Sequence, residues 1–127
     1  MDGSPSQNMW HSFTYSYATF IAISSETDYP GAPEGPDTPF RCGPFGNQLG
    51  WLEAQLIEAN AERDVRPWLV VSGHRPLYAP DFLPGSVGEM KHLRDAVEDL
   101  FLKYKVDIYL SGHGMIILFF LAYHSHY

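Results

Sequence analysis

The sequence predicts an α/β fold with a mixed β-sheet and two main helices. Two short runs rich in β-branched and aromatic residues, 67–71 and 106–110, are typical of buried strands. The residues between them carry a strong helical pattern, and a strand, helix, strand unit of this kind makes its two strands parallel. The tripeptide Ser-Gly-His follows both runs, as Ser72-Gly73-His74 and Ser111-Gly112-His113. We therefore expect both histidines at the same edge of the sheet.

The first elements predicted along the chain are two adjacent strands. Residues 9–16 and 17–24 alternate apolar and polar side chains and are rich in aromatic and β-branched residues. Residues 29–46 then contain five prolines and several glycines, a composition that forbids regular structure over most of the segment. This segment is predicted to be a long surface loop.

Two helices follow from the spacing of apolar residues. The first is predicted from Asn47 to about Arg63, with an inner stripe of Leu49, Leu52, Leu56 and Ala59 that we expect to pack on the strand at Trp68. The second lies between the two Ser-Gly-His motifs. One face of this helix gathers its apolar residues and the other its charges. The apolar residues are Leu93, Val97, Leu100, Phe101 and Tyr104.

The paired histidines suggest a metal site. Loops that leave the carboxyl ends of parallel strands converge at one edge of the sheet, where ligands of open α/β sheets bind. We expect the glycine before His74 and before His113 to let the backbone turn sharply, so that each imidazole points across that edge. The alternative is that each histidine only ends a strand and bonds to a nearby carbonyl.

The apolar segment 115–122 differs in composition from the rest of the chain. Eight residues are too few to cross a bilayer, which needs about 20. The segment is either a final buried strand or sequence that does not belong to the fold. His124 and His126 follow it, and we expect no functional role for them because a chain terminus is a poor platform for metal ligands.

Length and charge limit the classes of function. The 127 residues suit one modest domain, and the formal charge of −7 without a basic cluster disfavours nucleic acid as a partner. Cys42 is the only cysteine, so an internal disulfide is excluded. Residues 1–6 lack the basic start and apolar stretch of a signal peptide. No membrane partner is expected.

Several blocks of the sequence resemble the C-terminal half of the catalytic domain of purple acid phosphatases, a branch of the calcineurin-like metallophosphoesterases. The resemblance covers about residues 8–113, between an N-terminal extension, 1–7, and a divergent apolar tail, 114–127. It implies part of a four-layered αββα sandwich, hydrolysis of phosphate monoesters at acid pH, and a secreted or vacuolar location. The blocks, in chain order, are NMW at 8–10, SSETD at 24–28, QLGWLEAQ at 48–55, RPWLVVSGH at 66–74 and LRDAVEDLFLKYKVDIYLSGH at 93–113.

The family holds a dinuclear centre of Fe(III) with Zn, Mn or Fe(II), bound by five sequence blocks. By resemblance, His74 of the VxxH block and His113 of the GHxH block would bind the divalent metal. Met115 stands where the family has a histidine ligand for Fe(III), and a thioether suits ferric iron poorly. No Gly-Asp dipeptide occurs, so the two aspartate blocks are absent. We expect at most one weakly bound divalent metal, and a chain that is a partial copy of such an enzyme.

Other polar residues offer weaker candidates. Arg75 and Tyr78 follow His74 and could meet a phosphate oxygen, although surface solvation is the simpler interpretation. His92 could donate a proton to the leaving group or could be an exposed histidine. Two classes of function remain open: a metal-dependent acid phosphatase domain, and an inactive or partner-binding α/β remnant. Half of a sandwich would also expose apolar surface, so we expect self-association.

Overall fold

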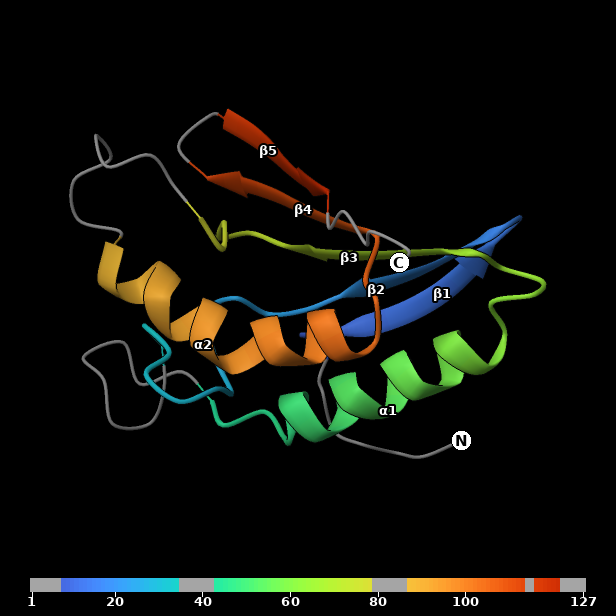
Figure 1. The fold of residues 1–127 in the computed structure, drawn as a ribbon. Helices are drawn as coiled ribbons and strands as arrows, with labels where there is room; N and C mark the ends of the chain where they lie inside the picture. The colour runs from blue at the N-terminus through green and yellow to red at the C-terminus, as the bar shows by residue number, and fades with distance from the viewer. Residues whose placement is uncertain (1–7, 35–42, 79–86, 114–115, 122–127) are drawn as a thin grey trace.

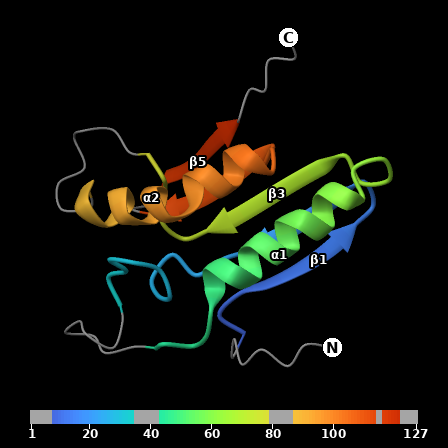
Figure 2. The same ribbon diagram turned by 60° about the horizontal axis from the view of Figure 1, so that its bottom comes forward.

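The computed structural model describes residues 8–34, 43–78, 87–113 and 116–121, and of 87–89, 113 and 116–121 only the backbone. These residues form a five-stranded sheet in the order β1-β2-β3-β4-β5 with two helices on one face (Figures 1 and 2). The prediction of an α/β fold with a mixed sheet and two main helices is confirmed.

The three central strands are parallel, and both edge pairs are antiparallel. Strand β1, His11–Tyr15, forms a hairpin with β2, Ala18–Ala22. Strand β3, Trp68–Gly73, pairs in parallel with β2 and with β4, Ile108–His113. Strand β5, Ile116–Leu121, runs antiparallel to β4 over its whole length. The apolar segment near the end of the chain therefore takes the first of its two predicted forms, a final strand.

Helix α1, Gln48–Ala61, connects β2 to β3, and helix α2, Val87–Lys103, connects β3 to β4. Crossovers between parallel strands share one hand, so two crossovers that advance across the sheet in the same direction place both helices on the same face. Asn47 caps α1, because its Oδ1 accepts a hydrogen bond of 3.0 Å from the Gly50 N–H. Helix α1 packs most closely against β2, and its Leu52 and Leu56 also join the buried cluster that contains Leu69 and Val71 of β3.

The core lies between the sheet and the helices. Alternate residues of the parallel strands point to the helix layer, which is the two-residue period of a strand with one covered face. Helix α2 contributes its predicted apolar stripe, of which Leu93, Val97 and Phe101 are buried. The buried cluster also includes Ile21, Leu52, Leu56, Leu69, Val71 and Tyr109.

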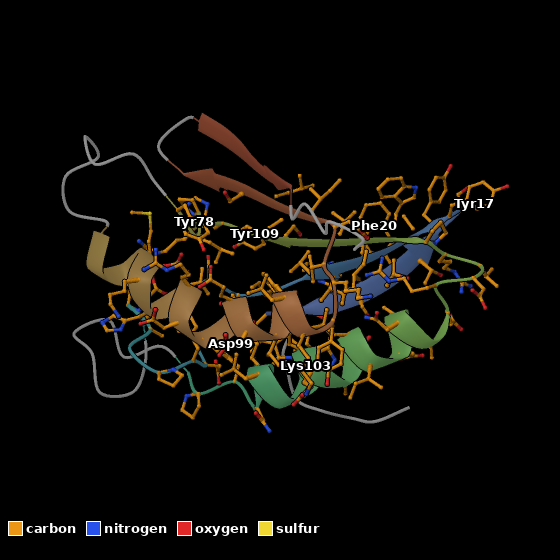
Figure 3. All side chains as sticks on the ribbon, viewed as in Figure 1. Tyr17, Phe20, Tyr78, Asp99, Lys103 and Tyr109 are labelled. Atoms are coloured by element: carbon orange, nitrogen blue, oxygen red, sulfur yellow. The ribbon has the colours of Figure 1, made fainter. Side chains whose placement is uncertain are left out.

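No described helix covers the other face of the sheet. Phe13, Tyr15 and Trp68 on this face are 52%, 74% and 55% exposed, and the rings of Phe13 and Phe20 stack at a centroid distance of 5.0 Å. Figure 3 shows Tyr17 on the side of the molecule opposite Asp99 and Lys103 of α2. We call Phe13, Tyr15, Phe20 and Trp68 the bare aromatic face.

Polar contacts join the amino ends of β3 and β4 to the ends of both helices. Arg63 donates hydrogen bonds of 2.6 Å to the Pro67 carbonyl and to Asp107 Oδ2. The same carboxylate oxygen accepts from the Leu69 N–H at 2.7 Å. These bonds satisfy groups that the strands leave unpaired where they begin. This end of the sheet is occupied by structural contacts, which leaves the carboxyl ends of the strands for other roles.

The described parts of the predicted loop, 29–34 and 43–46, contain no helix or strand. Neither described helix has the combination of length and apolar composition that a bilayer span requires.

Candidate metal centre

The backbones of the two Ser-Gly-His motifs lie side by side at the carboxyl ends of β3 and β4. Gly73 and Ser111 are partners in the parallel ladder, and the Gly112 N–H donates a hydrogen bond of 3.1 Å to the His74 carbonyl. His74 directly follows β3 and its side chain is exposed, whereas His113 is the last residue of β4. The side chain of His113 lies outside the described part of the structure. The backbone thus places both histidines at one edge of the sheet.

The motifs differ from the sequence prediction in where the strands end. Both strands were expected to finish before the serine, but β3 continues through Gly73 and β4 through His113. The sharp turn expected at each glycine is not seen, because Gly73 and Gly112 both lie within strands and neither has a positive φ. Backbone pairing across β3, β4 and β5 extends both strands further than side-chain patterning indicates.

Gly73 is required for a different reason, which is the space it leaves for a tyrosine. A Cβ at this position would lie 2.5 Å from the Tyr109 hydroxyl oxygen and 3.3 Å from Ile23. Tyr109 is buried and donates a hydrogen bond of 2.8 Å to the Arg75 carbonyl, so its hydroxyl cannot move aside freely. Burial, together with the nearby Tyr29 and Glu26, raises the pKa of Tyr109 above its ordinary value of 10.0. The hydroxyl therefore remains a donor at neutral pH.

The loop that follows β2 lies beside the first motif and is held by a buried glutamine. Gln48 is 2% exposed, and its Oε1 accepts from the Ser24 N–H at 2.6 Å. Its Nε2 donates to the Ser24 and Thr27 carbonyls at 2.9 and 3.0 Å. A buried amide with this many partners fixes the loop relative to the start of α1. The sequence gives no signal of this role: Gln48 is only the first residue of the block QLGWLEAQ, and nothing in that block indicates its hydrogen-bond partners.

The same loop binds Arg75. Nε of Arg75 donates to both carboxylate oxygens of Glu26, at 2.8 and 3.0 Å, and Nη2 donates to Oε2 at 2.8 Å. The Arg75 N–H also donates to Ser25 Oγ at 2.9 Å. A phosphate oxygen at this guanidinium would therefore compete with a carboxylate that is already bound.

Glu26 and Asp28, both in the SSETD block, have structural partners. Glu26 binds Arg75, and Asp28 Oδ1 accepts from the N–H groups of Phe45 and Gly46 at 2.9 and 3.1 Å. Asp28 thereby joins the two ends of the proline-rich segment. Their charges and spacing gave no signal of these partners, since each contact forms between residues at least 17 positions apart.

His92 lies on α2 with an exposed side chain, and its ring packs against Gly31. Among the residues whose side chains are described, no group of three or more His, Cys, Asp or Glu could hold a metal ion. Cys42, Met115, His124 and His126 fall outside the described residues.

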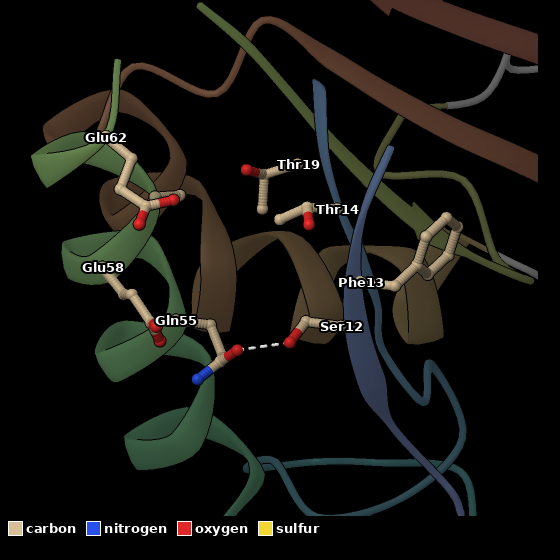
Figure 4. A pocket seen from close by; sticks show the side chains of 8 residues that line it. Ser12, Phe13, Thr14, Thr19, Gln55, Glu58 and Glu62 are labelled. Carbon is tan, nitrogen blue, oxygen red and sulfur yellow. Dashed lines mark hydrogen bonds between the residues drawn. The ribbon is translucent and has the colours of Figure 1, made fainter. Parts of the chain in front are cut away.

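A pocket of about 230 Å³ lies elsewhere, between the β1–β2 hairpin and α1 (Figure 4). The hairpin contributes Ser12, Thr14 and Thr19, and the helix and its C-cap contribute Gln55, Glu58 and Glu62. None of the histidines discussed above lines this pocket, so it is separate from the candidate metal centre.

Several known proteins that resemble this chain in sequence are acid phosphatases. The chain is 37% identical to an acid phosphatase of Aspergillus ficuum and 38% identical to acid phosphatase A of Cryphonectria parasitica; the matches cover 84% and 82% of this chain and 21% of either relative. It is 32% identical to Fe(3+)-Zn(2+) purple acid phosphatase 12 of Arabidopsis thaliana, over 83% of this chain and 19% of the relative. The chain therefore spans about a fifth of the length of these relatives.

A solved structure agrees with the sequence matches. The purple acid phosphatase PPD1 from yellow lupin, Lupinus luteus, superposes with a TM-score of 0.60 and 27% sequence identity, over 82% of this chain and 16% of that one. The family model described as calcineurin-like phosphoesterase matches residues 8–116, which include both Ser-Gly-His motifs. The chain belongs to the calcineurin-like phosphoesterase family.

Proposed function

We propose that this chain is part of a metal-dependent acid phosphatase that hydrolyses phosphate monoesters, and that it supplies His74 and His113 as ligands for a divalent metal. The observation that carries the proposal is the backbone bond between the motifs, in which the Gly112 N–H donates to the His74 carbonyl at 3.1 Å. The family match and the acid phosphatase relatives support the reaction class. A secreted or vacuolar location is part of the same proposal, by analogy with the family.

The residues present do not fit a complete dinuclear centre. Two metal ions held about 3.5–4 Å apart repel each other and need anionic ligands between and around them. The chain has no Gly-Asp block, and Met115 replaces a histidine of the family pattern. Two neutral imidazoles suit one divalent ion such as Zn²⁺ and leave at least two tetrahedral positions to solvent. We therefore propose one weakly bound divalent metal for this chain alone.

The proposed unit covers residues 8–113, preceded by an extension, 1–7, and followed by a tail, 114–127, that diverges in composition. The family match over 8–116 supports the two inner boundaries to within a few residues. Within this tail, the backbone of Ile116–Leu121 pairs with β4.

Two further residues are assigned minor roles. Arg75 is a phosphate contact only when Glu26 releases its guanidinium. His92, exposed on α2, is a candidate proton donor to the leaving group. Replacing Arg75 by Lys would remove the bidentate geometry while keeping the charge. A raised KM with unchanged kcat in that variant would support a role in binding phosphate.

Hydrolysis of a chromogenic phosphate monoester at acid pH, with added iron and zinc, tests the function. The proposal expects slow, metal-dependent turnover that the double variant His74→Ala/His113→Ala loses. His11→Ala is the matched control, because His11 is exposed on β1 and belongs to neither motif. Turnover that survives the double substitution would remove both histidines from the mechanism.

The second candidate is an inactive fragment that associates with copies of itself, and the bare aromatic face favours it. Exposed Phe13, Tyr15 and Trp68 form the kind of apolar patch that marks an interaction surface. Comparing the sedimentation of Trp68→Lys with that of Leu102→Lys distinguishes self-association through this face from non-specific hydrophobic association. Leu102 is the control because it is also exposed, at 58%, but lies on α2. Only Trp68→Lys should reduce the sedimentation coefficient. An equal effect of the two changes would contradict a role for this face.

A further inference from the structure

The pocket between the β1–β2 hairpin and α1 has a chemistry that the phosphatase proposal does not use. Its polar lining consists of oxygen-bearing side chains: the hydroxyls of Ser12, Thr14 and Thr19, the amide of Gln55 and two carboxylates. Figure 4 shows the strand hydroxyls on one side and Glu58 and Glu62 on the other. None of the lining residues is cationic. Such a surface suits a cation.

Thr19 supplies the observation that points to a ligand. It is 8% exposed, it lines the pocket, and its Oγ1 is buried with no hydrogen-bond partner among the described residues. A buried hydroxyl left without a partner costs about 1–3 kcal/mol. Valine has the same shape without that cost, so the hydroxyl calls for a partner from outside the described residues, and a bound ion would supply one.

The two carboxylates stand four residues apart, Glu58 in the last turn of α1 and Glu62 at its C-cap. Like charges four residues apart on a helix are neighbours and destabilise it slightly. Glu58 forms no ion pair with a described residue, and Arg66 binds Glu62 through Oε2, which leaves Oε1 for another partner. A cation between the two carboxylates would remove their repulsion.

The size and the donor set indicate which cation. The pocket volume of about 230 Å³ greatly exceeds the roughly 30 Å³ share of one water molecule, so an ion fits with part of its hydration shell. Oxygen donors without nitrogen or sulfur select hard cations such as Ca²⁺ and Mg²⁺ over zinc or copper. Donors spread over two strands and a helix suit the irregular coordination of Ca²⁺ better than the strict octahedron of Mg²⁺.

We propose that this pocket binds one hard divalent cation, preferentially Ca²⁺, through the carboxylates of Glu58 and Glu62 and the hydroxyl of Thr19. Gln55 has a supporting role, since its Oε1 already accepts from the Ser12 hydroxyl and so holds β1 against α1. The site is independent of His74 and His113, which lie outside the pocket lining.

Calcium titration by calorimetry, with urea unfolding in parallel, tests the proposal on the whole chain. We expect a dissociation constant of about 10⁻⁴–10⁻³ M, weaker binding of Mg²⁺, and a higher urea midpoint in Ca²⁺. Glu58→Gln/Glu62→Gln should abolish binding, and Thr19→Val should weaken it by about tenfold while keeping or raising the midpoint in calcium-free buffer. Glu98→Gln, on α2, is the matched control and should bind as the unmodified chain does.

The outcomes separate the possibilities. A purely structural Thr19 would leave the calcium affinity of Thr19→Val unchanged, which would overturn its assignment as a ligand. Absence of Ca²⁺ and Mg²⁺ binding up to about 10 mM, or binding that survives Glu58→Gln/Glu62→Gln, would overturn the site. His74→Ala/His113→Ala should bind Ca²⁺ normally, and a loss there would mean that the ion occupies the sheet edge instead.

Discussion

The two Ser-Gly-His motifs are identical in sequence and end neighbouring parallel strands, but their surroundings differ. A Cβ on Gly73 would meet the Tyr109 hydroxyl at 2.5 Å, whereas a Cβ on Gly112 would meet no described heavy atom within 4 Å. The first motif adjoins a loop fixed by Gln48 and Glu26, and the second pairs with the first on one side and with β5 on the other. Repetition of a tripeptide therefore predicts where two histidines lie, and the tertiary neighbours decide what each position tolerates.

The largest effect is expected from removing the amide that supports the first motif. Gln48→Met keeps the volume but leaves the Ser24 N–H and two carbonyls without their partner. We expect the free energy of unfolding to fall by about 3 kcal/mol. Urea unfolding measures this loss. Gln55→Met is the control, since Gln55 lies on the same helix and its side chain has one hydrogen-bond partner among the described residues, the Ser12 hydroxyl. Equal losses in both variants would contradict a special role for Gln48.

Alanine at the two glycines tests the difference between the motifs directly. Gly73→Ala forces Tyr109 or the backbone to shift, and overpacking of this kind costs about 2 kcal/mol. Gly112→Ala should change stability by no more than about 0.5 kcal/mol. Adding Tyr109→Phe to Gly73→Ala removes the atom in contact, and chemical denaturation should then show a smaller penalty than the sum of the two single changes. Additive losses would place the conflict elsewhere.

The buried Tyr109 makes stability depend on alkaline pH. Burial raises its pKa above 10.0 in the folded chain, so below pH 10 both the folded and the unfolded chains keep the proton. As the pH rises beyond that value the unfolded chain loses the proton first, and the free energy of unfolding falls. Tyr109→Phe should cost about 1 kcal/mol at pH 7 and weaken this alkaline loss. Thermal unfolding between pH 8 and pH 11 measures both, and an unchanged slope in the variant would contradict the assignment.

Periodicity was sufficient to predict most of the fold. The apolar stripe of α2 and the parallel pairing of β3 with β4 follow from residue spacing, because a helix and a strand place side chains with different periods. The exact ends of β3 and β4 did not follow, since they depend on backbone pairing with neighbours. The form of 116–121 was open for the same reason: an apolar run gives no sign of the partner strand that makes it β5.

The site was predictable only in its outline. His74 and His113 could be placed at one edge from topology, and the structure brings their backbones together. The Glu26–Arg75 ion pair and the hydrogen bonds of the Gln48 side chain could not be predicted. Glu26 and Arg75 are 49 residues apart, and the partners of Gln48 lie at least 21 residues away in the sequence. Buried polar contacts of this kind depend on tertiary packing, and a single sequence carries no periodic signal for them.

Calorimetric titration with Zn²⁺ tests most directly whether the two histidines share one ion. We expect one zinc ion per chain. His74→Ala and His113→Ala should each weaken zinc binding by at least about tenfold, because even the loss of a residue that hydrogen-bonds to a metal ligand typically costs that much. His92→Ala should bind zinc as the unmodified chain does. Undiminished zinc affinity in either His74→Ala or His113→Ala would contradict a shared site.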